Sequence, residues 1–148
     1  GFPIYRGQLA RVERALLNFL LDQNSDAGFE VIGLPYLVNR DTGITSGQLP
    51  KFIDQMYHVT EDDLFLIPTA EIALGGFHRN EILQESGLPL RYTAYTACFR
   101  REAGTYGIEE RGLVRTHQFN KVELFSFTSP ESSYEELERL RRKAETLV

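Results

Sequence analysis

Two stretches of the chain, residues 96–104 and 111–123, carry the side chains best suited to chemistry. Side chains alternate between the two faces of a strand, so Arg100 and Glu102 are expected on one face, with Arg101 on the other. In the second stretch the residues that share a face are Arg115, His117, Phe119, Lys121 and Glu123. An arginine fork binds phosphate, a phenyl ring stacks on a purine, and a carboxylate pairs with an amine. The spacing therefore indicates a sheet face that binds a nucleotide and an ammonium group.

The alternative interpretation of these charges is a solvated strand face with cross-strand ion pairs. His117 is expected to make a structural hydrogen bond rather than to take part in catalysis. His58 and His78 stand alone in the sequence with no metal-ligand spacing around them, so no metal site built from protein side chains is predicted. Cys98 is the single cysteine and is expected to be a buried, unreactive thiol.

The elements expected around these two stretches include both helices and strands. Helices are expected over residues 8–22, where apolar residues recur at helical spacing, and from Ser129 and Pro130 onward, which are suited to a helix start. Strands are expected over residues 29–38, 64–68, 91–100 and 113–128. Pro35 interrupts the first of these strands, which suits an edge or a bulge. The loops are expected at residues 39–50 and 102–112. This order predicts a mixed α/β (α+β) domain around a largely antiparallel sheet.

Each helix is expected to pack through an apolar face. In the first helix that face consists of Leu9, Val12, Leu16 and Leu20. In the tail helix it consists of Tyr134, Leu137, Leu140 and Ala144.

Composition limits the class of protein. The chain has 148 residues, 42% of them apolar, which fits one globular domain with a core of its own. The net charge of −5 argues against a broad basic surface for nucleic acid, so RNA contact would need a local patch or a separate module. Neither a signal peptide nor an apolar run of about 20 residues is evident. Together with the lone cysteine, these features predict a cytoplasmic protein that does not enter a membrane.

The two chemistry-bearing stretches together resemble motif 2 of class II aminoacyl-tRNA synthetases. The likeness is carried by Thr-Ala-Cys-Phe-Arg-Arg-Glu-Ala-Gly at residues 96–104 and by Arg-Gly-Leu-Val-Arg-Thr-His-Gln-Phe-Asn-Lys-Val-Glu at residues 111–123. The ending of the second stretch resembles that of seryl-tRNA synthetases. Motif 2 would thus extend over about residues 91–125.

Three further segments resemble the same family. Gly28-Phe29-Glu30 leading to Pro35 resembles motif 1, which would extend over about residues 8–38. Residues 47–52, Gly-Gln-Leu-Pro-Lys-Phe, and 67–71, Ile-Pro-Thr-Ala-Glu, resemble two seryl signatures. The likeness spans essentially the whole chain and implies a class II catalytic domain, an antiparallel sheet flanked by helices.

The resemblance implies an enzyme that activates L-serine with ATP and, in the full-length parent, transfers serine to tRNA(Ser). Arg100 and Glu102 are the implied catalytic residues, with Arg100 on the ATP α-phosphate and the serine carboxylate. The implied ATP-binding residues are Arg100, Arg101, Glu102, Arg115, Thr116 and Phe119. The implied serine-binding residues are Thr69, Ala70, Glu71, Arg100 and Glu123. Mg²⁺ would accompany ATP, and Pro35 would lie at the interface of a homodimer.

No stretch of residues 1–148 resembles the third motif of the family or its N-terminal tRNA-binding arm. The chain is therefore expected to be a partial, truncated catalytic domain. Two alternatives stay open. One is a ligase of the same fold that loads an amino acid onto a carrier protein, and the other is a non-catalytic module that retains the fold and dimerises.

Overall fold

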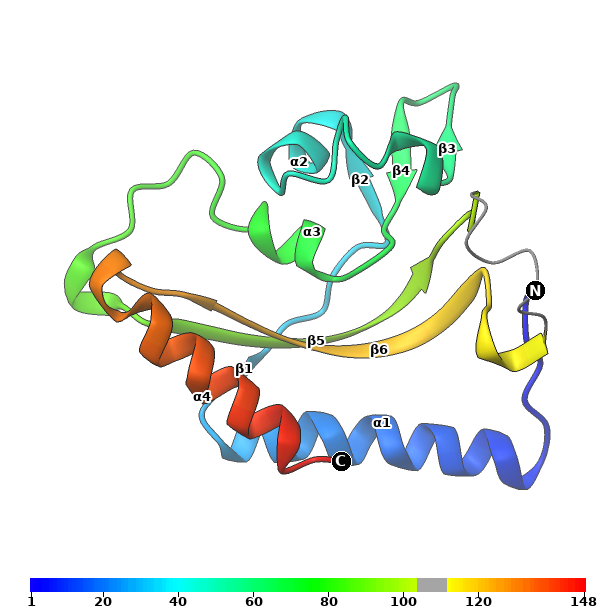
Figure 1. Ribbon diagram of the computed structural model, residues 1–148, viewed down its shortest axis with the longest axis horizontal. Helices are drawn as coiled ribbons and strands as arrows, with labels where there is room; N and C mark the ends of the chain where they lie inside the picture. Colours follow the sequence, from blue (N-terminus) through cyan, green and yellow to red (C-terminus); the bar gives the residue numbers. More distant parts are fainter. Residues whose placement is uncertain (104–111) are drawn as a thin grey trace.

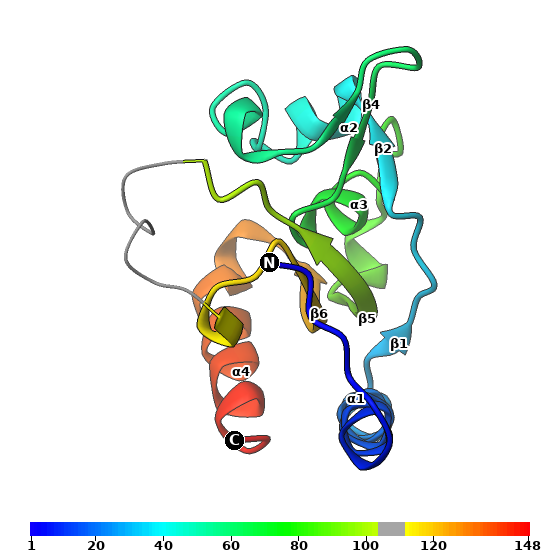
Figure 2. The ribbon, with the colours of Figure 1, turned by 90° about the vertical axis from the view of Figure 1, so that its right-hand side faces the viewer.

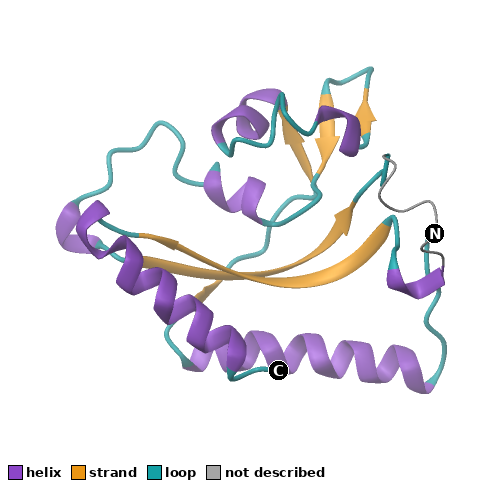
Figure 3. Ribbon diagram, viewed as in Figure 1, coloured by secondary structure: helices purple, strands orange, loops and turns teal. Residues whose placement is uncertain are grey.

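A computed structural model of the protein describes residues 1–103 and 112–148. Its main sheet has the strand order β1-β5-β6, in which β1 (Glu30–Val31) runs parallel to β5 (Leu90–Phe99) and β5 runs antiparallel to β6 (Gln118–Phe127). A smaller antiparallel sheet has the order β2-β4-β3 and consists of Leu37–Asn39, Leu64–Leu66 and His58–Val59. Figure 3 shows both sheets with their helices. The predicted mixed architecture with antiparallel pairing is confirmed.

The two sides of the main sheet carry different layers. The helices α1 (Gln8–Asp26) and α4 (Ser133–Glu145) lie on one side of it, as Figures 1 and 2 show. The smaller sheet lies on the other side with α2 (Arg40–Thr45) and α3 (Glu71–Gly75). Short 3₁₀ turns occur at Ile53–Gln55 (η1), Glu85–Gly87 (η2), Gly112–Val114 (η3) and Pro130–Ser132 (η4).

Apolar packing is concentrated between the two sheets. One cluster joins the small sheet to α3 and the loop before it, and contains Val38, Leu49, Met56, Phe65, Ile67, Ile72 and Ala73. A second cluster fixes α3 on the main sheet and contains Ala70, Leu74, Tyr92 and Ala94. Phe65, Ile67, Ile72 and Leu74 are completely inaccessible to solvent. The segment from β4 through α3 is therefore held rigidly above the hairpin of β5 and β6.

The first helix differs from its prediction in both length and face. It continues to Asp26 because Asn24 turns inward, is buried, and donates from Nδ2 to Thr93 Oγ1 at 3.0 Å. Of the predicted apolar face only Leu20 is partly buried, whereas Leu9, Val12 and Leu16 are each more than half exposed. Residues of the sheet-facing side instead include Ala10, Glu13, Leu17, Leu20, Leu21 and Asn24. Polar bonds to the sheet, which apolar periodicity does not register, set the rotation of the helix.

The strand predicted over residues 29–38 is two strands in two different sheets. β1 pairs with β5 and β2 pairs with β4, and the exposed Pro35 lies in the connection between them. Proline has no N–H to donate, so it suits a place where one ladder has ended and the next has not begun. The Tyr36 carbonyl accepts from Ile67 N–H at 2.9 Å, next to the pairing of β2 with β4.

The segment expected to be a loop at residues 39–50 contains the helix α2. Asn39 caps it by accepting from the Thr42 N–H at 2.9 Å. Gly43 allows the loop to close over this helix, because a Cβ there would lie 2.6 Å from Leu49 Cδ1. Of the strand predicted over residues 113–128, the part before Gln118 is not a strand and includes η3. The loop predicted over residues 102–112 lies mostly in 104–111, outside the described residues.

The tail helix also packs through a face other than the predicted one. Tyr134 is 85% exposed and Leu137 is 60% exposed, while Glu136 is buried against the sheet. Arg91 on β5 donates to both carboxylate oxygens of Glu136, at 2.6 and 2.7 Å, and Ser126 on β6 donates at 2.9 Å. An ion pair therefore fixes α4 on the hairpin, because Arg91 and Ser126 project from the side of the sheet that α4 covers.

Candidate functional site

A pocket of about 780 Å³ lies between the hairpin of β5 and β6 and the segments around η1 and the start of α3. The hairpin strands and the segments beside them supply Arg100, Glu102, Leu113, Val114, Arg115, Thr116, Phe119 and Lys121. The other wall consists of Gln48, Phe52, Gln55 and Met56. The segment before α3 supplies Pro68 and Thr69, and the first residue of α3 supplies Glu71. The pocket thus brings together residues from three regions that are far apart in the sequence.

The register of the hairpin sorts side chains as the sequence predicts. Cys98 pairs with Phe119, Thr96 with Lys121, and Ala94 with Glu123. The three β5 residues in these pairs are small and almost or fully buried, whereas their β6 partners are larger and partly exposed. On the opposite face, Asn120 donates to Glu13 of α1 at 2.6 Å. Small residues on β5 therefore leave room for the longer side chains of β6 on the pocket side.

Arg100 and Phe119 form the centre of this face. The Arg100 guanidinium carbon lies 5.0 Å from the centroid of the Phe119 ring, within the range of a cation–π contact. Its Nε donates to the Pro68 carbonyl at 3.3 Å, which ties it to the wall before α3. A guanidinium held beside a flat ring presents phosphate-binding donors next to a surface on which a base can stack.

Glu102 and Arg115 form an ion pair at the pocket edge, with Arg115 Nε 2.6 Å from Glu102 Oε2. Glu102 has a φ of +51°, a left-handed conformation that is uncommon for a residue with a side chain. This change of backbone direction explains how Glu102 stays on the pocket side after β5 has ended at Phe99. Thr116 also lines the pocket.

Arg101 lies outside the pocket lining, in agreement with the strand alternation. Its guanidinium donates to the Asp54 carbonyl at 3.3 Å and its backbone N–H donates to the Gln55 carbonyl at 2.9 Å. The Gln55 side-chain amide in turn donates to the Ala103 carbonyl. These bonds hold the backbone on either side of Glu102 against η1.

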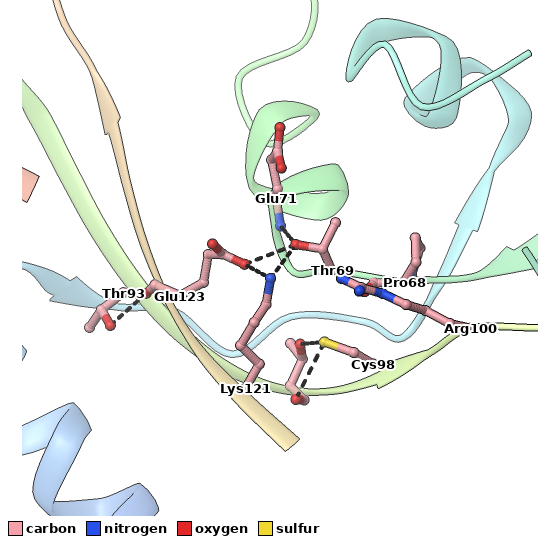
Figure 4. Close-up of polar contacts among 9 residues, drawn as sticks. Pro68, Thr69, Glu71, Thr93, Cys98, Arg100, Lys121 and Glu123 are labelled. Atoms are coloured by element: carbon pink, nitrogen blue, oxygen red, sulfur yellow. Dashed lines mark hydrogen bonds and ion pairs between the residues drawn. The ribbon is translucent and has the colours of Figure 1, made fainter. Parts of the chain in front are cut away.

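A compact polar cluster lies beside the start of α3, as Figure 4 shows. Thr69 Oγ1 donates to Glu123 Oε2 at 2.9 Å and accepts from Lys121 Nζ at 2.8 Å. The Lys121 ammonium is also 2.5 Å from Glu123 Oε2. The Glu71 backbone N–H donates to Thr69 Oγ1 at 3.3 Å. The structure therefore brings Thr69 and Glu123 together, although they are 54 positions apart in the sequence. Glu71 contributes its backbone N–H to this cluster, while its side chain points away from Thr69 (Figure 4). Thr69 and Glu71 line the pocket, whereas Glu123 is not among its lining residues.

Ala70, implied in serine binding, is completely buried and belongs to the apolar cluster between α3 and the sheet. Its side chain supports the pocket rather than lining it. No signal in the sequence indicated Gln55 or Met56, which line the pocket, while Leu113 and Val114 line it within the motif 2 stretch. Gln48 and Phe52 line the pocket opposite the hairpin, and they belong to the seryl signature at residues 47–52.

The remaining predicted residues have structural places. His117 donates from Nδ1 to the Arg100 carbonyl at 3.0 Å, so its predicted structural hydrogen bond is present. Cys98 is fully buried as predicted, and burial raises the pKa of its thiol. His58 stacks on Phe65 and His78 lies between Glu81 and Tyr92. Within residues 1–103 and 112–148, no group of three or more His, Cys, Asp or Glu side chains is arranged to hold a metal ion.

The hairpin and the pocket on its inner face define a known class of protein. Residues 54–147 match the model of the class II core domain of tRNA synthetases for glycine, histidine, proline, serine and threonine. Because this match covers more than half of the chain, the chain belongs to the class II tRNA synthetase core family.

Within that class the chain is similar to serine–tRNA ligases. It is 52% identical over 149 residues to the enzyme of Chlorobium chlorochromatii and 55% identical over 148 residues to that of Geobacillus kaustophilus. These alignments cover 100% and 99% of this chain but 35% of each relative. The chain therefore spans about a third of the length of the curated relatives it matches.

Solved structures give the same result. The seryl-tRNA synthetase of Pyrococcus horikoshii, solved in complex with ATP, superposes with a TM-score of 0.90 at 43% identity over 96% of this chain and 32% of its own. The cytoplasmic serine–tRNA ligase of Naegleria fowleri, solved in complex with AMP, superposes with a TM-score of 0.89 at 33% identity over 97% of this chain and 34% of its own. The resemblance to seryl-tRNA synthetases is thus confirmed by sequence and by structure. Among the described residues, no helix has the length and apolarity needed to cross a membrane.

Proposed function

We propose that this chain is the part of a serine–tRNA ligase that binds ATP and L-serine for formation of seryl-adenylate. The observation that carries the proposal is the placement of Arg100 and Phe119 on the same sheet face as the cluster of Thr69 and Glu123. A phosphate-binding cation and a stacking ring thereby lie next to acceptors for an ammonium group. The two relatives solved with ATP and with AMP support a nucleotide as the occupant of the first part.

In the proposed reaction an oxygen of the serine carboxylate attacks the α-phosphorus of ATP. The bond from that phosphorus to the bridging oxygen breaks, and pyrophosphate leaves with its electron pair. Arg100 would stabilise the charge that develops on the α-phosphate and hold the attacking carboxylate beside it. The Phe119 ring would stack on adenine, and Glu102 with Arg115 would fix the nucleotide at the pocket edge. No protein nucleophile is required.

Recognition of serine would be the task of Thr69, Glu71 and Glu123. A pocket whose carboxylate and hydroxyl groups hydrogen-bond the substrate binds an analogue poorly when that analogue leaves them unpaired. Alanine would therefore be rejected, because it lacks the side-chain hydroxyl of serine. Mg²⁺ would bind on the phosphates of ATP and offset their charge. Arg101, which points to η1, would act on the hairpin backbone rather than on ATP.

The whole protein would transfer the seryl group to tRNA(Ser) and would work as a homodimer in the cytoplasm. Support for dimerisation comes from the exposed apolar stripe of α1 (Leu9, Val12, Leu16 and Phe19) and from Pro35, which is exposed in the connection between β1 and β2 within the motif 1 segment. Motif 1 is proposed to extend over about residues 8–38, and motif 2 over about residues 91–125.

Serine-dependent exchange of pyrophosphate into ATP tests the proposal on the 148-residue chain. Exchange that requires serine, that alanine and threonine do not support, and that Arg100→Ala abolishes would establish adenylation. Arg14→Ala, which removes an exposed arginine on α1, is the matched control and should leave exchange unchanged.

Two other outcomes have distinct meanings. A folded chain that binds a non-hydrolysable seryl-adenylate analogue without exchange would limit its role to binding within the longer protein. Absence of both exchange and analogue binding would contradict the proposal for this chain and favour a non-catalytic module. Transfer of the activated amino acid to a carrier protein rather than to tRNA would favour the other ligase of the same fold.

A further inference from the structure

Lys121 lines the pocket and has no part in the proposed reaction. Its ammonium lies 2.8 Å from Thr69 Oγ1 and 2.5 Å from Glu123 Oε2. Both acceptors belong to the proposed site for the serine ammonium. The Lys121 side chain is 31% exposed and that of Glu123 is 22% exposed, so the pair is partly withdrawn from water.

The bonding capacity of Thr69 is complete in this arrangement. A hydroxyl has one proton to donate and two lone pairs that accept. The proton is directed to Glu123 Oε2, and the lone pairs accept from Lys121 Nζ and from the Glu71 backbone N–H. A further ammonium cannot be accepted by Thr69 unless one of these donors leaves. Lys121 is the donor able to leave, because it stands on a flexible four-carbon side chain, whereas the Glu71 N–H is fixed at the start of α3.

We propose that the Lys121 ammonium occupies the site of the substrate ammonium, and that serine binds by replacing one ammonium group with another. This inference depends on the proposed serine site. The exchange keeps the Glu123 carboxylate paired with a cation before and after binding, which avoids an uncompensated charge in a partly buried place. It also makes Lys121 a specificity-determining residue, since a ligand without a cation of its own cannot take its place.

Competition from Lys121 has a measurable consequence for affinity. If the ammonium of Lys121 holds the site nine-tenths of the time, the apparent dissociation constant of serine is about tenfold larger than the intrinsic one. Lys121→Met removes the competing charge and retains the length of the side chain, so it should tighten serine binding by up to about tenfold. Lys121→Arg retains a cation and should not tighten it.

The experiment is calorimetric titration of the 148-residue chain and its variants with L-serine and with ethanolamine, which carries the ammonium and hydroxyl groups but no carboxylate. Lys143→Met is the matched control, because it removes the same charge from α4, on the other side of the main sheet. Ethylene glycol, which lacks the ammonium, should bind no variant. Tighter binding of both amines by Lys121→Met alone supports the inference, while weaker or unchanged binding overturns it.

A second measurement observes the unmodified chain, so its result does not depend on a substitution at Lys121. The chain has three lysines, Lys51, Lys121 and Lys143, so isotope-labelled ammonium signals are few and can be assigned by removing Lys51 and Lys143. Serine should shift the signal of Lys121 and leave the other two in place. Serine binding without this shift would overturn the inference. If the unmodified chain does not bind serine, the proposed function of the chain fails, and the ethanolamine titrations alone decide the inference.

Discussion

Glu123 places one carboxylate oxygen within reach of both the Thr69 hydroxyl and the Lys121 ammonium. Arg100, on the same face, is bound to the Phe119 ring and to the Pro68 carbonyl. Two cations that line the pocket are thus paired, Arg100 with the Phe119 ring and Lys121 with the neighbouring Glu123 carboxylate. Residue substitutions should therefore separate the serine part of the pocket from the nucleotide part.

Glu123→Gln keeps the size of the side chain and removes its charge. A hydrogen bond to a charged group contributes about 1.5–3 kcal/mol, so the KM for serine in pyrophosphate exchange should rise about 10- to 100-fold while that for ATP changes little. Glu131→Gln, on the exposed turn η4, should change neither constant. Equal effects on serine and ATP would contradict the assignment of Glu123 to the serine part.

At the scale of elements, the turn η1 supports the backbone that follows β5, at Arg101 and Ala103. The Gln55 carbonyl accepts from Arg101 N–H at 2.9 Å, and the Gln55 side chain donates to the Ala103 carbonyl. Glu102, between these two anchors, has the left-handed φ of +51°. A residue with a side chain adopts this conformation when its surroundings enforce it.

Gln55→Ala should release one of these anchors and raise the KM for ATP about three- to tenfold, in line with the loss of one hydrogen bond. Faster amide hydrogen exchange at Arg101, Glu102 and Ala103 would show that the effect is on backbone position. The exposed Gln84 provides the control Gln84→Ala, which should be neutral. A raised KM with unchanged hydrogen exchange would mean that Gln55 contacts ATP directly instead.

The attachment of α4 predicts a pH-dependent stability. Two hydrogen bonds from Arg91, together with that from Ser126, hold the pKa of Glu136 below its ordinary value of 4.5 despite its burial. A carboxyl with a lowered folded-state pKa contributes stability above its unfolded pKa, and this contribution is lost as pH falls through the folded-state value. Glu136→Gln should reduce the free energy of unfolding at pH 7 by about 1.5–3 kcal/mol, because it removes charge-assisted hydrogen bonds and leaves the partly buried Arg91 guanidinium without its counter-charge.

Urea denaturation at several pH values measures this effect, and the difference between the unmodified chain and Glu136→Gln should shrink below pH 4.5. Glu138→Gln is the informative comparison. Arg141 and Arg142 lower the pKa of Glu138 to about 2, yet these ion pairs lie in water and should add little to stability. A difference for Glu136→Gln that does not change with pH would contradict the ion-pair explanation.

At the scale of the whole molecule, α1 leaves an apolar stripe uncovered. Leu9, Val12, Leu16 and Phe19 are each 51–61% exposed, on the side of the helix that does not contact the sheet. Contiguous exposed apolar residues of this kind mark association surfaces. The stripe agrees with the proposed homodimer through the motif 1 segment.

Leu16→Glu should therefore shift the chain from dimer to monomer in sedimentation velocity experiments, since it places a charge within the proposed contact. The thermal stability of the monomer should change little, because Leu16 contributes little to the core. Asn18→Glu adds the same charge at another exposed position of α1 and should leave the association unchanged. An unmodified chain that stays monomeric at all concentrations would contradict the dimer proposal for this chain.

The sequence by itself determined the local features of the fold and site. Alternation along β5, continued to residues 100 and 101, and along β6 placed Arg100, Phe119 and Glu123 on one face and Arg101 on the other, because strand side chains have a period of two that the order of the residues reveals. The motif spellings indicated the class II family, which the comparisons confirm. These inferences succeeded because each depends on neighbours within a single element.

Only the tertiary structure decided which distant residues meet. The contact of Thr69 with Glu123 and Lys121 depends on how α3 is seated on the hairpin, and the Gln55 contacts with residues 101–103 depend on how η1 is folded over it. The faces of α1 and α4 were predicted wrongly for the same reason. Buried polar bonds from Asn24 and Glu136 to the sheet set their rotation, and the partner of such a bond is not encoded in helical periodicity.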